Sequence, residues 1–137
     1  GAAREFGLPL VDQTAGLPND KFFVPGAVLQ VAVDDSNPLA HGLGTQLDVF
    51  FNNNPAVKIT GEAANVHAVA WFPNAMPLRS GWAWGQGALD KGVEVVSAKV
   101  GQGNVFLFAP EILFRSQPHG NYKLFFNGLY LSVADLK

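Results

Sequence analysis

Four polar side chains after an apolar run are the residues whose chemistry is easiest to interpret in this sequence. They follow residues 105–109 and are Glu111, Arg115, Gln117 and His119; we call them the polar corner. Ligand crevices of α/β folds lie beyond the carboxyl ends of strands, where a carboxylate, a guanidinium and an imidazole would bind a polar ligand or transfer protons. The alternative, which we favour, is that Arg115 pairs with Glu111 and the set satisfies a buried corner.

Metal binding is a second possibility to weigh. His41, His67 and His119 are the three histidines, and none of their spacings matches the short pairs typical of zinc sites. Simpler interpretations are that His41 lies in a glycine-rich turn, that His67 lies on the more polar face of a strand, and that His119 begins a helix, where it can bond the backbone. Oxygen ligands for calcium occur at Asp34, Asp35, Asn37 and Asp48. These lack the spacing of an EF-hand loop, so a capped turn is the simpler interpretation, and we expect no metal in this chain.

Aromatic side chains offer a binding surface of another kind. Trp71, Trp82 and Trp84 would form a flat platform for a sugar ring if they were exposed together. Tryptophan in a small domain more often belongs to the core or to an interface. The sequence leaves both interpretations open.

Catalytic residues are not predicted anywhere in the chain. The sequence has no cysteine, which excludes a thiolate nucleophile, a disulfide and a cysteine-based zinc site. The glycines Gly101 and Gly103 are not accompanied by the third glycine or the Lys-Ser/Thr of a phosphate loop. An independent hydrolase built on Glu111, Arg115 and His119 is therefore only a third hypothesis.

Composition favours a domain that contacts other protein. Only 15% of the 137 residues are charged and 48% are hydrophobic, against roughly 25% charged in typical soluble domains. Apolar patches on a chain of this kind usually mark an interface. The net charge of −2, with nine scattered Lys and Arg, excludes the basic stripe of a nucleic-acid-binding protein. No apolar run approaches the roughly 18 residues of a membrane span.

The elements expected to position these side chains are mostly strands. Alternating or continuous apolar patterns predict strands at 27–33, 46–51, 57–60, 66–72, 93–100 and 104–109. Gly101 and Gly103 supply the turn of a hairpin that spans 93–109. The second hairpin strand has no polar face, so we expect it to be central and covered on both sides.

A helix is expected near 118–133, with Pro118 in its first turn and Ser116 or Gln117 as its cap. Its apolar stripe is Tyr122, Phe125, Phe126, Leu129 and Val133. Leu124, Tyr130 and Leu131 make the opposite side apolar too. We predict a β-rich α/β fold with a mixed sheet. Residues 1–25 would be a connecting segment with the tail of a helix at 2–6, and residues 26–137 a single accessory domain.

Three ordered groups of segments carry a family resemblance. They are FFVPGAVL with DDSNPLAHGL at 22–29 and 34–43, PLRSGW at 77–82, and VGQGNVFLF with FRSQPHGNYKLFFN at 100–108 and 114–127. In this order they resemble the C-terminal class I glutamine-amidotransferase-like domain appended to some bacterial zinc carboxypeptidases of the carboxypeptidase A class. The resemblance covers about residues 20 to 130. It implies the later part of an amidotransferase-like, flavodoxin-like fold, with the first strands and helices upstream of Gly1.

Neither chemistry of that family carries over to a residue of this chain. The amidotransferase nucleophile is a cysteine, and the peptidase zinc site needs a His-x-x-Glu pair that this sequence lacks. The resemblance therefore implies a non-catalytic accessory domain that packs on the peptidase domain or mediates assembly, with zinc only in the parent peptidase domain. The partner would be the upstream domain or a second copy, in a periplasmic or secreted bacterial protein. A carbohydrate or cell-wall binding module that uses the tryptophans is the alternative.

Overall fold

An eight-stranded sheet with one long helix forms the structure, a computed structural model that describes residues 2–61 and 63–134. The strands are β1 (Leu10–Asp12), β2 (Ala27–Val33), β3 (Gln46–Phe51), β4 (Val57–Ile59), β5 (Val66–Trp71), β6 (Leu78–Ser80), β7 (Val93–Val100) and β8 (Gly103–Phe108). The α-helices are α1 (Ala2–Glu5) and α2 (Tyr122–Ala134). Four short 3-10 helices connect them: η1 (Pro38–Ala40), η2 (Gln86–Leu89), η3 (Phe114–Ser116) and η4 (His119–Asn121).

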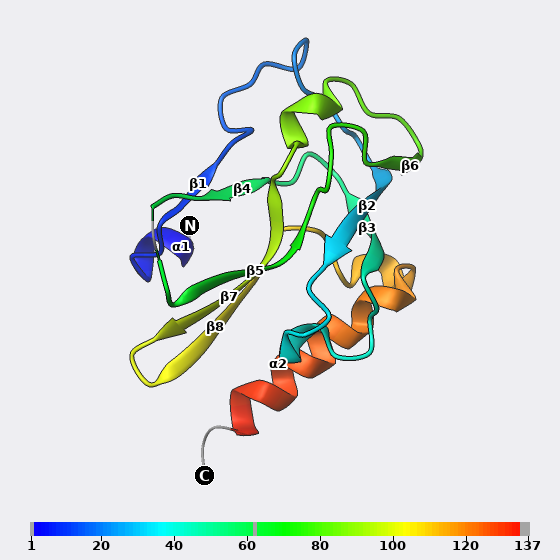
Figure 1. Ribbon diagram of the computed structural model, residues 1–137. Helices are drawn as coiled ribbons and strands as arrows, with labels where there is room; N and C mark the ends of the chain where they lie inside the picture. Colours follow the sequence, from blue (N-terminus) through cyan, green and yellow to red (C-terminus); the bar gives the residue numbers. More distant parts are fainter. Residues whose placement is uncertain (1, 62, 135–137) are drawn as a thin grey trace.

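The strands follow the order β1-β4-β7-β5-β2-β3, with β6 paired to β2 and β8 paired to β7 (Figure 1). The expected β-rich α/β content and the hairpin at 93–109 are confirmed. The expected mixed sheet is wrong, because every strand pair in the described residues is antiparallel. A parallel pair needs a long crossover, usually a helix. In the described residues, the connections between these strands are turns, irregular loops and short 3-10 helices.

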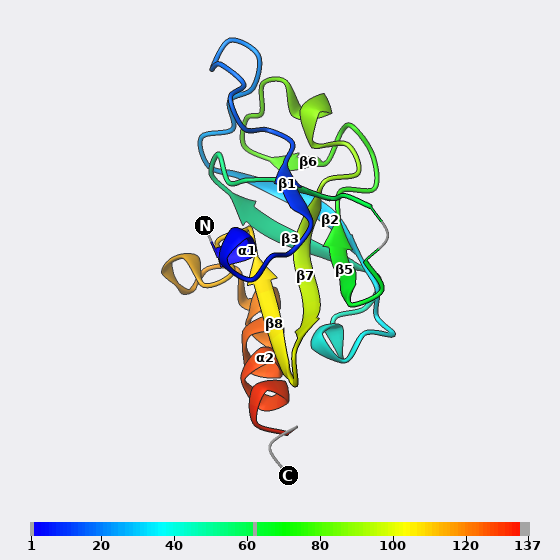
Figure 2. The same ribbon diagram turned by 90° about the vertical axis from the view of Figure 1, so that its left-hand side faces the viewer.

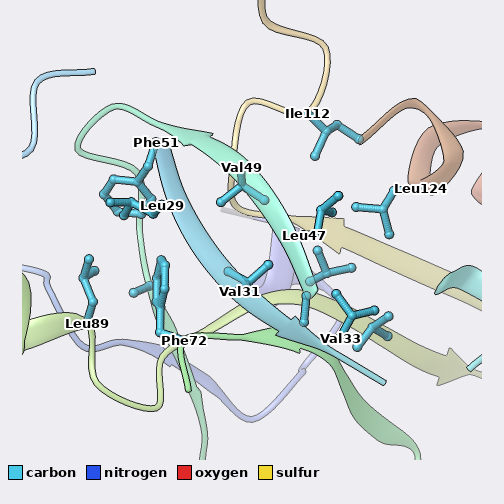
Figure 3. Packing of buried hydrophobic residues seen from close by; sticks show 14 of the residues in the cluster. Leu29, Val31, Val33, Leu47, Val49, Phe51, Phe72, Leu89, Ile112 and Leu124 are labelled. Atoms are coloured by element: carbon cyan, nitrogen blue, oxygen red, sulfur yellow. The ribbon is translucent and has the colours of Figure 1, made fainter. Parts of the chain in front are cut away.

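Apolar alternation explains the main core. Leu29, Val31 and Val33 of β2 point to one side of the strand and are buried, while the residues between them are half-buried. On the paired strand β3, Val49 and Phe51 face the same cluster. Figure 3 shows these side chains interdigitating with Phe72, Leu89, Ile112 and Leu124. The period-two pattern thus fixed which face of each strand is covered.

The second hairpin strand departs from expectation. Within the described chain β8 pairs with β7 alone, so it lies at an edge instead of the centre of the sheet. Its two faces are nevertheless each partly covered. Phe106 and Phe108 pack on the main core, whereas Val105 and Leu107 pack on a second, smaller cluster. Figure 2 shows β8 running beside α2. Apolar residues on both faces of a strand indicate that both faces are covered. They do not indicate whether both hydrogen-bonding edges of the strand are paired.

The helix near the C-terminus is confirmed, and it begins later than its sequence signals suggest. α2 starts at Tyr122, preceded by η3 and η4, so neither Ser116 nor Gln117 caps it. Leu124 and Gly128 form its buried side. The Asn127 amide donates to the carbonyl oxygens of Leu39 at 2.9 Å and His41 at 3.0 Å, which ties α2 to η1.

The N-terminal segment takes part in the sheet. α1 confirms the short helix expected at 2–6. β1 pairs with β4, and Leu8 belongs to the second cluster together with Val66, Val93, Val96 and Ala98. Residues 1–25, expected as a connection, therefore contribute an edge strand and part of a core.

Candidate functional site

The polar corner is spread over an irregular segment instead of converging on one point. Glu111 is half-buried, whereas Arg115, Gln117 and His119 are exposed. In the part of the chain that the structure describes, the only ion pair joins Arg79 to Asp48, so the Glu111–Arg115 pair is not formed.

Ring contacts hold the corner instead. The Arg115 guanidinium lies 5.2 Å from the centroid of the Phe114 ring, which itself stacks on Phe50 at 4.0 Å. The His119 ring lies 5.4 Å from that of Tyr122. Arg115 adopts a positive φ of 44°, a conformation that is uncommon outside glycine. No pair of the four predicted side chains shares a hydrogen bond in the described residues, so the geometry does not assemble acid–base chemistry there.

The metal candidates are also separate. Over the residues described, no three His, Asp or Glu side chains gather as a metal site. Asp34 accepts hydrogen bonds from the amide and hydroxyl of Ser36, and Asn37 accepts one from the Leu39 amide at 3.0 Å as the N-cap of η1. These side-chain oxygens therefore serve a capped turn, and Asp48 lies apart on β3.

The tryptophans divide into two groups. Trp71 is half-buried and packs on the second cluster. Trp82 and Trp84 are 53% and 54% exposed, and both contact Phe23. Trp84 exchanges two backbone hydrogen bonds with Phe23, and its indole Nε1 donates to the Asp20 carbonyl at 2.8 Å. The predicted three-residue surface is thus reduced to the Trp82–Trp84 pair.

One side of α2 carries large apolar side chains that the described residues leave exposed. Phe126, Leu129, Tyr130 and Val133 are 61%, 51%, 71% and 59% exposed; we call them the docking face. Phe126, Leu129 and Val133 belong to the stripe that the sequence marks most strongly. Tyr130, which was expected on the opposite side of the helix, lies on the same side because it follows Phe126 by four residues. Tyr122 and Phe125 of the stripe are half-buried, and Phe125 packs on the main core, so only the later part of the stripe points away from the core. Beside Tyr130 a hollow of about 360 Å³ is lined by polar residues of the 35–41 turn, including Asp35, Asn37 and His41.

Sequence reasoning missed a buried carboxyl. Glu94 lies in β7 with 1% of its surface exposed, and neither carboxyl oxygen has a hydrogen-bond partner among the described residues. Burial first, and then the charge of Asp12, raise the pKa of Glu94 well above its usual value. The signal was present, because one acidic residue interrupts the apolar run from Val93 to Val96.

Glu94 lines a cavity of about 440 Å³. We call it the Glu94 cavity; its other lining residues are Ala3, Arg4, Leu10, Asp12, Pro55, Val57, Val96, Leu107, Phe108 and Ala109. Asp12 is held by Thr14, whose amide and hydroxyl donate to Asp12 Oδ1 at 2.9 and 2.7 Å. The cavity therefore combines apolar walls with two carboxyl groups in different environments.

Comparisons with known proteins add no assignment. No protein-family model matches the sequence, and a search of curated proteins found no match either. Among the described helices, none has the length and apolarity needed to cross a membrane.

Proposed function

We propose that this chain is a non-catalytic interaction domain that binds its partner through the docking face of α2. The exposure of Phe126, Leu129, Tyr130 and Val133 on one side of one helix is the observation that carries the proposal. Contiguous apolar surface of this kind is typical of interfaces, and Tyr and Phe are enriched at their centres. Polar residues of the 35–41 turn, among them Asp35, Asn37 and His41, line the hollow beside Tyr130 and supply the kind of rim that surrounds such a centre.

The partner in this proposal is the upstream peptidase domain of a bacterial zinc-carboxypeptidase-like protein. The ordered segments that resemble the domain appended to those enzymes support this choice. In the same proposal the chain is the later part of an amidotransferase-like domain, and the parallel strands of a flavodoxin-like sheet come from upstream. The edge position of β8 beside α2 is compatible with further protein on that side.

The test compares two charge insertions on the same helix. Leu129→Arg places a charge in the docking face, and Ser132→Arg places one on an exposed residue outside it. We expect Leu129→Arg to weaken binding of the chain to the peptidase domain by roughly tenfold or more, as for a central interface residue. Calorimetric titration of both variants measures this, with circular dichroism to show that both are folded.

Activity provides an independent readout. The parent protein is assayed with and without residues 2–137 at matched zinc occupancy. A loss of kcat/KM, or a change in the preferred peptide size, is expected if the domain shapes access to the peptidase cleft. Equal affinities for the two arginine variants, together with unchanged activity of the truncated enzyme, would remove the proposal.

A carbohydrate-binding surface at Trp82 and Trp84 is the second candidate function. Both indoles are about half exposed, and the hydrogen bond from Trp84 to Asp20 fixes one ring. Titration with chitin and cell-wall oligosaccharides should shift the tryptophan fluorescence of the wild type. Trp82→Ala should abolish the shift, whereas Trp71→Phe, which alters a half-buried ring, should preserve it. An unshifted spectrum at millimolar oligosaccharide would eliminate this candidate.

A further inference from the structure

The position of Glu94 in the sheet explains why its side chain faces a cavity. Strand β5 pairs with β7 from Ala98 to Val93, so β4 and β8 must share the opposite edge of β7. β8 pairs with residues 95–100, and β4 pairs only at Val93. Glu94 lies at the point where these two neighbours separate, and its carbonyl still accepts a hydrogen bond from Ala109 at 2.8 Å.

A purely structural role does not account for this residue. A buried carboxyl without a hydrogen-bond partner opposes folding, and an apolar residue of similar size would pack there without that cost. Its neighbours on the same side of β7, Val96 and Ala98, belong to the second apolar cluster. Buried polar groups that lack partners are rare in native proteins and call for an explanation. A ligand that donates hydrogen bonds to Glu94 supplies one.

We propose that the Glu94 cavity binds the ammonium group of a small organic amine. The ammonium group donates to the carboxyl oxygens of Glu94, and its charge is balanced by Glu94 and Asp12. The apolar chain of the amine lies against Val57, Val96 and Leu107. A volume of about 440 Å³ accommodates a ligand of this size together with a few waters.

Other ligand classes fit the lining less well. A calcium or magnesium ion needs about six oxygen ligands, and among the described residues two carboxyl groups line the cavity. An anion would face both carboxyls. Arg4 is the one basic side chain among the described lining residues, and it is exposed on α1, at the solvent side. A neutral apolar molecule would leave the Glu94 oxygens without partners.

Binding of the amine is coupled to the protonation of Glu94. The charged groups that face Glu94 are Asp12 from β1 and Arg4 from α1; the lining residues from β4 and β8 are apolar. The raised pKa of Glu94 favours its protonated form in the free protein, whereas a bound ammonium group favours the ionised form, so binding to the protonated form releases a proton. The affinity for the amine should therefore rise with pH.

The probe is n-hexylamine, compared with hexan-1-ol, which has the same chain and no charge. Calorimetric titration of the intact chain at about pH 8 should give an affinity for hexylamine roughly tenfold or more above that for hexanol, as expected for a charge-assisted hydrogen bond. NMR shifts of the Val57, Glu94 and Ala109 amides should locate the amine in the cavity. The hexylamine affinity should fall as the pH is lowered.

Three variants decide the outcome. Glu94→Gln should weaken hexylamine binding about tenfold and remove its pH dependence, with hexanol binding unchanged. Glu5→Gln removes the same charge from an exposed residue outside the cavity and should leave binding intact. The proposal is overturned by no hexylamine binding to the wild type, or by equal binding to Glu94→Gln. Binding that occurs only after Arg4→Gln would overturn it too, since Arg4 would then be the native partner of Glu94.

Discussion

Asp12 and Glu94 line the same cavity from β1 and β7, with β4 lying between these strands in the sheet. Their environments are unequal. Asp12 is half-buried and its carboxyl group accepts two hydrogen bonds from Thr14, whereas the carboxyl group of Glu94 is buried and accepts none from the described residues. A buried carboxyl group whose pKa is raised, as that of Glu94 is, and which lines a cavity is a common feature of ligand sites.

Glu94→Gln should remove a pH dependence of stability. The pKa of Glu94 is raised above 4.5 by burial and by Asp12, so the native state holds a proton that the unfolded chain loses. Its contribution is present below about pH 4.5 and is lost as pH rises through the raised pKa. We expect the variant to be more stable than the wild type near pH 8 and similar to it at low pH. Urea unfolding across this range measures the difference.

The control for that experiment is Glu5→Gln, which changes the same charge at an exposed position. It should keep the wild-type dependence on pH. If the stability of Glu94→Gln changed with pH in the same way as that of the wild type, the pH dependence of stability could not be assigned to Glu94.

Gly128→Ala should stabilise the protein. A Cβ at this buried helix position would lie 3.5 to 3.7 Å from its nearest neighbours, which are ordinary contacts, in Leu39, Phe106 and Phe108. Alanine favours a helix interior over glycine by about 0.5 to 1 kcal/mol, and the free energy of unfolding should rise by that amount. Gly128→Val would add two further carbons to the same contacts and should destabilise by about 1 to 3 kcal/mol. A loss of stability in the alanine variant would mean that α2 lies closer to β8 than described.

Asn127→Ala should loosen α2 from the 38–41 turn. The variant loses the two hydrogen bonds to the carbonyls of Leu39 and His41, and it gains some helix propensity. A net loss of about 1 kcal/mol is expected from thermal or urea unfolding. Ser132→Ala is the matched variant, because among the described residues that hydroxyl bonds within its own helix, to the Leu129 carbonyl. Its stability should change by less than about 0.5 kcal/mol.

Gly85→Ala should disrupt the segment that carries the exposed tryptophans. Gly85 has a φ of 68°, and a Cβ there would overlap the Lys21 carbonyl oxygen. We expect a loss of about 2 kcal/mol or more, since the left-handed conformation and the overlap both oppose the side chain. Gly87→Ala has free space around the added Cβ and should be close to neutral. Similar melting temperatures for both variants would argue against the described path of this loop.

Strand positions were the part of the fold that the sequence predicted best. The alternation in β2 and the apolar run of β3 place these strands at their observed bounds, because one covered face imposes a period of two on the side chains. The hairpin turn was equally clear, since Gly101 has the positive φ of 60° that glycine permits. Both are local properties of the chain.

Strand order and exposure were not predictable in the same way. Nothing local distinguishes an edge strand from a central one when both of its faces are apolar, as in β8. Likewise the apolar stripe of α2 has the same period whether it faces the core or solvent, and here Phe126 and Leu129 are exposed while Leu124 is buried.

The candidate site shows the same division. The sequence by itself determined the residue types that exclude a thiolate nucleophile, and it determined the strand in which Glu94 lies. Only the tertiary structure decided that Glu94 and Asp12, far apart in the chain, line one cavity, while the neighbouring residues of the polar corner do not converge. The physical reason is that hydrophobic pattern and secondary-structure propensity act over a few residues. A site depends instead on which strands pair and on where paired strands separate.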